Sequence, residues 1–416
     1  MSWGYWKRAC AVLFLLATLI LAGCAQPLPS DEPVTITFAC PASEKERYQA
    51  LVLQFNEEYP HITVELDSVA EADDADAGDS DILIISPFDL SDMVEQNAIL
   101  SMGPFIEQDS SFDPSDFYPG TVELLTRDGK MWAVPAGVDL VVLYYSKDLF
   151  DASGVPYPAP GWTWDNFLNA ALALRDPGAE VFGYGPMDGF IEALIFIYQH
   201  GGRILDDMQS PTRWTFDDPL TIEALEWYAA LIHEHNVAPT QEQIYALGSS
   251  IESGVYLGQV GMWTGWLSER GGGTGDVQDR WPGEWKMRWG MISLPRDAQA
   301  GTLAWVLGYA ISAETAHPEA CWQWIAFLSQ QSQAAFGMVP PRKSIAESAV
   351  YEQLVGAEAA AVARQSMESA MLISPTLVEF GDLGVYGRAI NAIIEGSATP
   401  QEAMTRAQQQ VTQEGP

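Results

Sequence analysis

One carboxylate stands inside a segment that is expected to form a buried strand. Asp139 interrupts the run Val138-Asp-Leu-Val-Val-Leu-Tyr-Tyr145, which is otherwise apolar or aromatic. A buried charge without partners is costly, so this carboxylate must accept hydrogen bonds either from the hydroxyl groups of a ligand or from backbone donors. We favour the ligand. The chain also contains 15 tryptophans, 15 tyrosines and 16 phenylalanines, whose rings can serve as flat apolar platforms for a bound molecule.

Further polar and aromatic candidates follow the strands expected near the N-terminus. Ser86, Phe88 and Asp89 come directly after the apolar run 82–85, and Ser43 follows the strand expected at 34–38. Ligands of open α/β sheets bind beyond the carboxyl ends of the strands. We therefore expect these four side chains to lie beside a cleft.

The remaining candidates come from the later part of the chain. Asp188 and Phe190 precede an apolar helix, and Glu379 lies close to the C-terminal helices. Trp305 is expected in the loop that leads into the strand containing Gly308, either as a platform for a ligand or as a packing residue.

Cys24 is the candidate for covalent modification. It follows Leu21-Ala-Gly23 at the end of an apolar run, and Lys7 and Arg8 precede that run. This pattern predicts a secretory signal over 1–23, because the run is shorter than the ~20 residues that span a bilayer. Leu-Ala-Gly-Cys resembles a bacterial lipobox, which implies a lipoprotein signal, cleavage before Cys24 and lipidation of its thiol. We expect an extracytoplasmic protein of the cell envelope, with a tether over 24–33 and a lipid anchor as its only link to the membrane; the alternative is an ordinary secreted protein.

Composition restricts the classes of partner. The formal net charge of −36 repels phosphate backbones, so nucleic acid is not an expected partner. The acidic residues between 71 and 81 lack the spacing of a calcium loop, and we expect a solvated loop there, with no metal and no cofactor. Cys40 and Cys321 remain after removal of the signal, and their pairing is left open because disulfide geometry is narrow.

The order of the expected elements indicates an α/β architecture. Strand patterns occur at 34–38, 62–66 and 82–85, with a helix between the first two that opens on a capping box of Ser43 and Glu46. Later strands are expected at 138–145, 288–294 and 305–312, and later helices after Thr163, at 220–235, at 319–329 and from Pro400 onward. At 416 residues the chain exceeds the usual size of a single core, so two lobes are expected.

Several stretches together resemble the extracellular solute-binding proteins of ABC transporters, in the sugar-binding family that includes maltose-binding protein. They are Ile36-Thr-Phe38 with Phe55-Asn-Glu-Glu-Tyr-Pro60, Asp81-Ile-Leu-Ile-Ile85, Trp132-Ala-Val-Pro135 with Leu143-Tyr-Tyr-Ser-Lys-Asp-Leu-Phe150, Gly258-Gln-Val-Gly-Met-Trp-Thr-Gly-Trp266, Gly308-Tyr-Ala-Ile-Ser312 and Ile393-Ile-Glu-Gly396. Their order and spacing are specific, although each is weak alone. The chain departs from the family between Leu66 and Asp81, which is short, and at Trp305-Val-Leu307, where Gly-Gly is usual.

This resemblance implies a two-lobe α/β fold of the periplasmic-binding-protein type (type II), with discontinuous lobes joined by hinge strands. We expect lobe 1 to comprise 34–137 plus 294–338, and lobe 2 to comprise 138–293 plus 339–416. The ligand is expected in the cleft between them, where Trp266 matches the family's aromatic residue. Binding shifts the hinge equilibrium toward a closed form.

The implied function is capture of a sugar, expected to be an oligosaccharide, by a monomer that delivers it to ABC transporter permease subunits without acting as an enzyme. One alternative is a secreted glycoside hydrolase, which needs two carboxylates ~5–10 Å apart. Another is a binding protein for a non-sugar solute, such as a peptide or a polyamine. No Gly-x-Ser-x-Gly, His-Glu-x-x-His or Cys-x-x-Cys motif occurs in the chain.

Overall fold

A β-sheet with both parallel and antiparallel strands forms the centre of the protein. The computed structural model describes residues 33–69, 80–187, 189–208, 210–248, 250–270, 287–335, 337–381 and 383–414. Within these residues, the strand order of the main sheet is β2 (Ile62–Val69), β1 (Val34–Pro41), β3 (Ile82–Ile85), β10 (Thr302–Ile311), β6 (Val134–Ser146), β8 (Val260–Trp266) and β7 (Phe182–Gly185). β11 (Ala370–Leu372) pairs with β10, and β9 (Trp289–Ile292) pairs with β6. A separate hairpin joins β4 (Thr126–Arg127) to β5 (Lys130–Met131).

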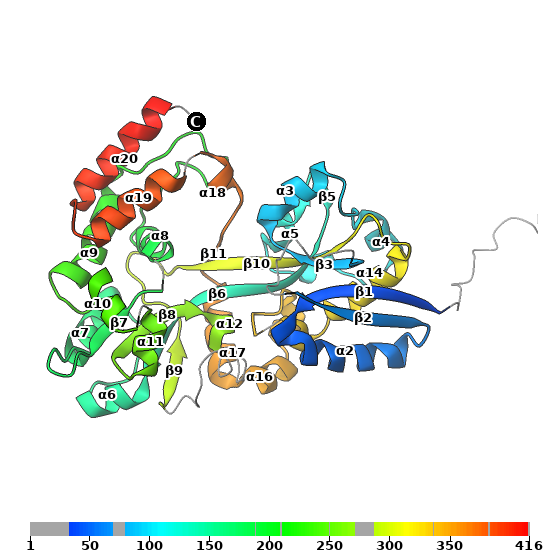
Figure 1. Ribbon diagram of the computed structural model, residues 1–416, viewed down its shortest axis with the longest axis horizontal. Helices are drawn as coiled ribbons and strands as arrows, with labels where there is room; N and C mark the ends of the chain where they lie inside the picture. Colours follow the sequence, from blue (N-terminus) through cyan, green and yellow to red (C-terminus); the bar gives the residue numbers. More distant parts are fainter. Residues whose placement is uncertain are drawn as a thin grey trace, which may run out of the picture.

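Two long strands, β6 and β10, connect the two lobes (Figure 1). The first part of β6 pairs with β10 through residues 134–140, and its second part pairs with β8 through residues 141–145. β10 pairs with β3 at 308–311 and with β11 at 302–304. Every residue of β6 is buried, which explains its nearly continuous apolar sequence. The prediction of a loop at Trp305 was wrong, because hydrogen bonding to β6 and β11 starts β10 at Thr302.

The first lobe packs helices against β1, β2 and β3. Its core includes Phe38, which meets Tyr48 edge to face with ring centroids 4.8 Å apart. α2 (Lys45–Glu58) and α14 (Pro318–Leu328) bring Tyr48 and Trp324 to this core. The predicted capping box of Ser43 and Glu46 is not formed, since a 3-10 turn, η1 (Ala42–Glu44), occupies the expected first turn and the N-cap of α2 is Glu44, which makes no side-chain cap hydrogen bond.

The second lobe contains a larger core of helices around β7 and β8. It is built from α6 (Lys147–Ser153), α7 (Trp164–Leu174), α8 (Gly189–Gln199), α9 (Pro219–His233), α19 (Leu383–Ile394) and α20 (Pro400–Glu414). Thr163 caps α7 as predicted, and its N–H donates to Oδ1 of Asn166 at 3.3 Å.

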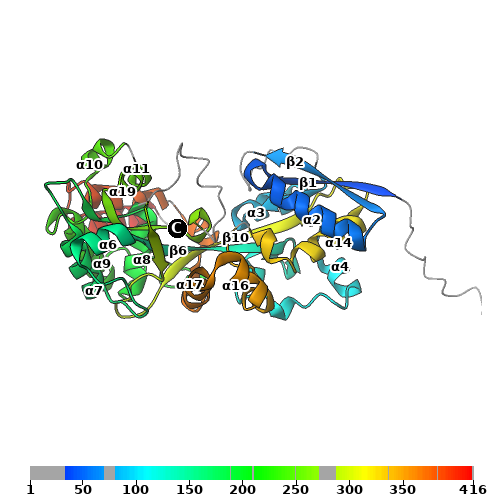
Figure 2. The same cartoon turned by 90° about the horizontal axis from the view of Figure 1, so that it is seen from below.

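A third apolar cluster lies where the lobes join. α15 (Lys343–Ala346), α16 (Ala349–Val355) and α17 (Ala357–Met367) contribute residues to it, together with the central parts of β6 and β10. Figure 2 shows α16 and α17 between the two lobes, beside the crossing strands. The predicted limits of the lobes stay a prediction.

The remaining helices are short. They are α3 (Pro87–Glu95), α4 (Gly103–Gln108), η2 (Pro114–Asp116), α5 (Thr121–Leu124), α10 (Gln241–Ala246), α11 (Ile251–Tyr256), α12 (Leu267–Arg270), η4 (Ser332–Ala335) and α18 (Thr376–Glu379). Among the described residues, no helix combines the length and the apolar character needed to cross a membrane. Cys40 and Cys321 are both buried and unpaired, and burial raises the pKa of the Cys40 thiol to about 11.

The two-lobe α/β prediction is confirmed by this architecture and by the structural likeness reported below. The predicted signal, the tether and most of the acidic segment lie outside the described residues.

Candidate functional site

Asp139 lies on β6 at the crossing between the lobes and is only 8% exposed. Its Oδ1 accepts hydrogen bonds from the backbone N–H groups of Leu140 and Ser268, both at 3.0 Å. Its Oδ2 accepts the Ser268 hydroxyl at 2.5 Å. Burial raises the pKa of Asp139 to about 6, and these hydrogen bonds oppose that rise. The carboxylate therefore has internal partners, which is the alternative that the sequence left open, and contact with a ligand stays a prediction.

Trp305 and Phe88 form a stacked aromatic pair. Their ring centroids are 5.0 Å apart and their planes differ by 11°. Trp305 lies on β10 directly opposite Asp139 in the strand register, and Phe88 lies in the first turn of α3. Both rings are partly exposed, so the pair combines mutual packing with an accessible apolar edge.

Ser86 and Asp89 fix the start of α3. Ser86 donates to Oδ2 of Asp89 from its hydroxyl at 2.6 Å and from its backbone N–H at 3.2 Å. Pro87 occupies the first helical position, which suits its fixed φ and its missing N–H. This cap holds the helical turn that presents Phe88, while contact of Ser86 or Asp89 with a ligand stays a prediction.

Trp266 ends β8 opposite Val141 of β6. Its backbone carbonyl accepts the hydroxyl of Tyr144 at 2.9 Å, and its partly buried ring packs on the core of the second lobe. Ser268, the hydrogen-bond partner of Asp139, is two residues further on. The fold thus brings the Trp266 segment next to Asp139, although the two are distant in sequence.

The other predicted site residues are not brought into this group. Ser43 is exposed in the turn after β1. Phe190 packs edge to face on Tyr386, with centroids 4.9 Å apart. Asp188 lies outside the described residues, and Glu379 ends α18 with a side chain that the structure does not describe.

A pocket of about 610 Å³ lies between the lobes. Pro87 and Leu90 of α3 line it, whereas Phe88 and Trp305 do not. Its first-lobe wall is formed by residues of α3 and α5, and its second-lobe wall by residues 374–376, which connect β11 to α18. Figure 1 shows α3, α5 and α18 on the same side of β10. The volume is in the range of small-molecule sites. Trp266 and Asp139 are not among the residues that line this pocket.

The charge of this interlobe pocket is predominantly negative. Asp92, Glu95 and Glu123 line it, and Arg127 is held by Glu95 with a nitrogen–oxygen distance of 2.9 Å. Such a wall disfavours an anionic solute. Arg342 does not offset it, because its guanidinium is buried between Phe112 and Phe117, with distances of 4.6 and 4.5 Å to the ring centroids.

Sequence reasoning missed a second buried carboxylate, Glu192 of α8, which is 1% exposed. It accepts hydrogen bonds from the Tyr184 hydroxyl at 2.7 Å, from the Met187 N–H at 3.4 Å and from the Thr264 hydroxyl. The available signal was the one that Asp139 gave, since Glu192 is the lone acid in the apolar run 190–197. Glu192 therefore connects α8 to β7 through Tyr184 and to β8 through Thr264. Thr264 lies two residues before Trp266.

These features, two α/β lobes joined by long strands with a pocket between them, define a hinged solute-binding protein. A family profile described as "Bacterial extracellular solute-binding protein" matches residues 41–335, so the chain belongs to that family.

The curated relatives include one oligosaccharide-binding protein and one uncharacterised lipoprotein. An arabinooligosaccharide-binding protein of Halalkalibacterium halodurans is 24% identical over 220 residues, 50% of this chain and 47% of the relative. An uncharacterised lipoprotein of Streptomyces antibioticus is 27% identical over 248 residues, 56% of this chain and 53% of the relative. The chain therefore spans about half the length of these curated relatives. A structure of an ABC substrate-binding protein from Listeria monocytogenes in complex with cycloalternan has a TM-score of 0.75 at 21% identity, over 92% of this chain and 99% of that one, which shows the fold.

Proposed function

We propose that this protein captures a neutral oligosaccharide in the interlobe pocket and delivers it, by hinge closure, to the permease subunits of an ABC importer. The observation that carries the proposal is a pocket of small-molecule size whose walls belong to different lobes. One of these walls includes Pro87 and Leu90 of α3, the helix whose first turn holds the stacked ring of Phe88. Sugar hydroxyls bond to carboxylates and to other hydroxyls, and both kinds of group line this pocket, for example Asp92, Glu123 and Ser374. A solute held by both walls stabilises the closed form.

The ligands named for similar proteins support a saccharide as the solute. The named ligands of two of them are arabinooligosaccharide and cycloalternan. The acidic wall of the interlobe pocket favours a neutral or cationic solute over an acidic sugar. We also propose that the mature chain acts as an extracytoplasmic monomer and carries a lipid on Cys24, in line with the lipobox-like sequence and the lipoprotein relative.

A titration of the purified protein with a library of neutral oligosaccharides tests the proposal. We expect heat of binding and a rise in Tm with at least one member, and the sugar recovered unchanged by chromatography. Release of shorter sugars would instead identify a glycoside hydrolase. Binding of peptides or polyamines in parallel titrations, without binding of any saccharide, would identify a receptor for a non-sugar solute.

The lipid anchor has its own test. The Cys24→Ser variant, expressed in a bacterial host with radiolabelled palmitate, should lose the label and leave the membrane fraction, whereas Cys321→Ser should keep both. A labelled Cys24→Ser protein would exclude this residue as the lipidation site.

A further inference from the structure

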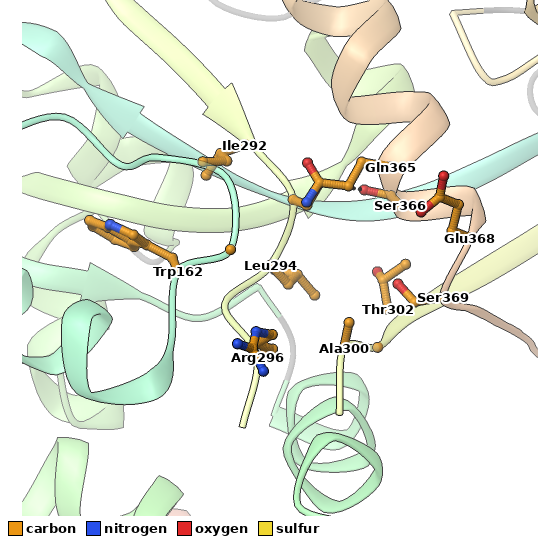
Figure 3. A pocket seen from close by; sticks show the side chains of 13 residues that line it. Trp162, Ile292, Leu294, Arg296, Ala300, Thr302, Gln365, Ser366, Glu368 and Ser369 are labelled. Carbon is orange, nitrogen blue, oxygen red and sulfur yellow. Dashed lines mark hydrogen bonds between the residues drawn. The ribbon is translucent and has the colours of Figure 1, made fainter. Parts of the chain in front are cut away.

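A second cavity, of about 250 Å³, lies apart from the interlobe pocket at the second-lobe end of the crossing strands (Figure 3). The connection from β9 to β10 forms one wall, the end of α17 forms another, and the segment before α7 forms a third. No residue lines both this cavity and the interlobe pocket. The cavity holds only a small molecule, because it is smaller than typical sites for drug-sized ligands.

Backbone hydrogen bonds fix the wall between β9 and β10. The N–H of Arg296 donates to the carbonyl of Trp162 at 2.9 Å, and the carbonyl of Arg296 accepts the N–H of Trp164 at 3.0 Å. Further along, the side-chain amide of Gln199 donates to the carbonyl of Gly301 at 2.7 Å. The cavity is therefore built by anchored segments and does not depend on a loose loop.

Two opposite charges line this cavity from different walls. Arg296 lies on the connection between β9 and β10, and Glu368 follows the end of α17 (Figure 3). Both residues are exposed, and neither side chain forms an ion pair within the part of the chain that the structure describes. The neighbouring acid Asp297 is engaged with His200, at 2.5 Å between Oδ2 and Nδ1, and does not neutralise Arg296.

The other lining groups complement a small polar molecule with an apolar part. Gln365 and Ser369 add an amide and a hydroxyl beside Glu368, and the side chain of Leu294 offers apolar surface between Arg296 and Glu368, whereas the indole of Trp162 points away from them. A guanidinium recognises a carboxylate, and a carboxylate recognises an ammonium group. One ligand that carries both groups, with a short side chain, satisfies both walls at once.

We infer that this cavity binds a free α-amino acid, with the ligand carboxylate at Arg296, its ammonium group at Glu368 and its side chain against Leu294. This site goes beyond the proposed capture of a sugar and does not depend on it.

Isothermal titration of the full chain with each of the twenty standard α-amino acids tests the inference. We expect binding of at least one, weakened by at least about tenfold in Arg296→Gln and in Glu368→Gln, since each removes a charged hydrogen bond. Arg203→Gln and Glu234→Gln, which make the same charge changes on exposed residues of the second lobe away from the cavity, should bind as the unmodified protein does.

Modified ligands separate the two contacts. The methyl ester of the bound amino acid should bind about tenfold more weakly than the free acid to the unmodified protein but equally to Arg296→Gln. The N-acetyl derivative should show the same loss of discrimination in Glu368→Gln. Absence of binding by all twenty amino acids, or binding that neither substitution weakens, would overturn the inference. Oligosaccharide binding should persist in both variants, so a failure here is distinct from a failure of the proposed function.

Discussion

Trp305 stacks on Phe88 with 5.0 Å between the ring centroids, and thereby joins the crossing strand β10 to the first turn of α3. The two residues are far apart in sequence, and the elements that carry them, α3 and β10, contact each other in the first lobe. Because β10 also pairs with β11 of the second lobe, this aromatic contact lies on the path by which the lobes are connected.

Truncation of Trp305 should weaken ligand binding more than it weakens the fold. We propose that Trp305 serves as a platform for the sugar, although it does not line the interlobe pocket in this structure. Trp305→Ala removes that platform and the stacking with Phe88, so we expect a loss of oligosaccharide affinity of about tenfold or more, corresponding to at least ~1.4 kcal/mol. Trp305→Phe keeps an aromatic face and should retain most of the affinity. Calorimetric titration of both variants gives the measurement, with Tyr245→Ala as the control, since Tyr245 is 64% exposed on α10 of the second lobe. Equal affinities in Trp305→Ala and the unmodified protein would place the sugar elsewhere.

Ser86→Ala should reduce both stability and affinity, because the Ser86 hydroxyl binds Asp89 and helps to hold the turn that carries Phe88. Loss of a serine cap costs about 1 kcal/mol. Urea unfolding measures the first effect, and titration with the bound sugar the second, where we expect a loss of several-fold.

The matched control for this cap is Ser348→Ala. Ser348 caps α16 by accepting the N–H of Tyr351 at 3.1 Å, and α16 does not line the interlobe pocket. The free energy of unfolding of Ser348→Ala should fall by about as much as that of Ser86→Ala, while its affinity for the sugar should not change. If both variants keep full affinity, the cap of α3 has no part in ligand binding.

Strand and helix patterns predicted the framework well, since they depend on local periodicity. The strand around Asp139 and the helix capped by Thr163 were found where the sequence placed them. The start of β10 was missed because Thr302 and Leu303 are held by pairing with β11, a segment almost 70 residues away. The predicted capping box of Ser43 and Glu46 was wrong because a 3-10 turn forms at Ala42–Glu44.

The site was harder to predict than the fold. Polarity and position identified Phe88 and Trp305 separately, but only the tertiary structure shows that they stack. For Asp139 the apolar run predicted that the carboxylate needs partners but not which ones, because Ser268 lies in α12, far away in the sequence. Glu192 passed unnoticed since its partners come from β7 and β8.

Asp139→Asn should change how stability depends on pH. Burial raises the pKa of Asp139 from 3.8 to about 6 in the folded protein, so the folded state binds more protons than the unfolded state between these values. The favourable contribution of Asp139 to the free energy of unfolding is therefore present at pH ~4 and is lost as the pH rises through about 6. A shift of this size corresponds to about 3 kcal/mol at most.

Asparagine does not ionise, so the free energy of unfolding of the variant, relative to the unmodified protein, should increase as the pH is raised from about 4 to about 7. Urea unfolding at several pH values measures this difference. Asp165→Asn, at an exposed position of α7, should show no such trend. A constant difference between Asp139→Asn and the unmodified protein would mean that Asp139 titrates normally.

Glu192→Ala should destabilise the second lobe. It leaves the buried hydroxyl of Tyr184 and the N–H of Met187 without this acceptor, and an unsatisfied buried group costs about 1–3 kcal/mol. Glu192→Gln keeps one carbonyl oxygen and should lose less, whereas Glu234→Ala, at an exposed position after α9, should lose almost nothing. Chemical unfolding ranks the three variants. Because Thr264, another partner of Glu192, lies two residues before Trp266, the alanine variant should also bind sugar more weakly if Trp266 contacts the ligand. An unchanged unfolding midpoint in Glu192→Ala would show that this network contributes no stability.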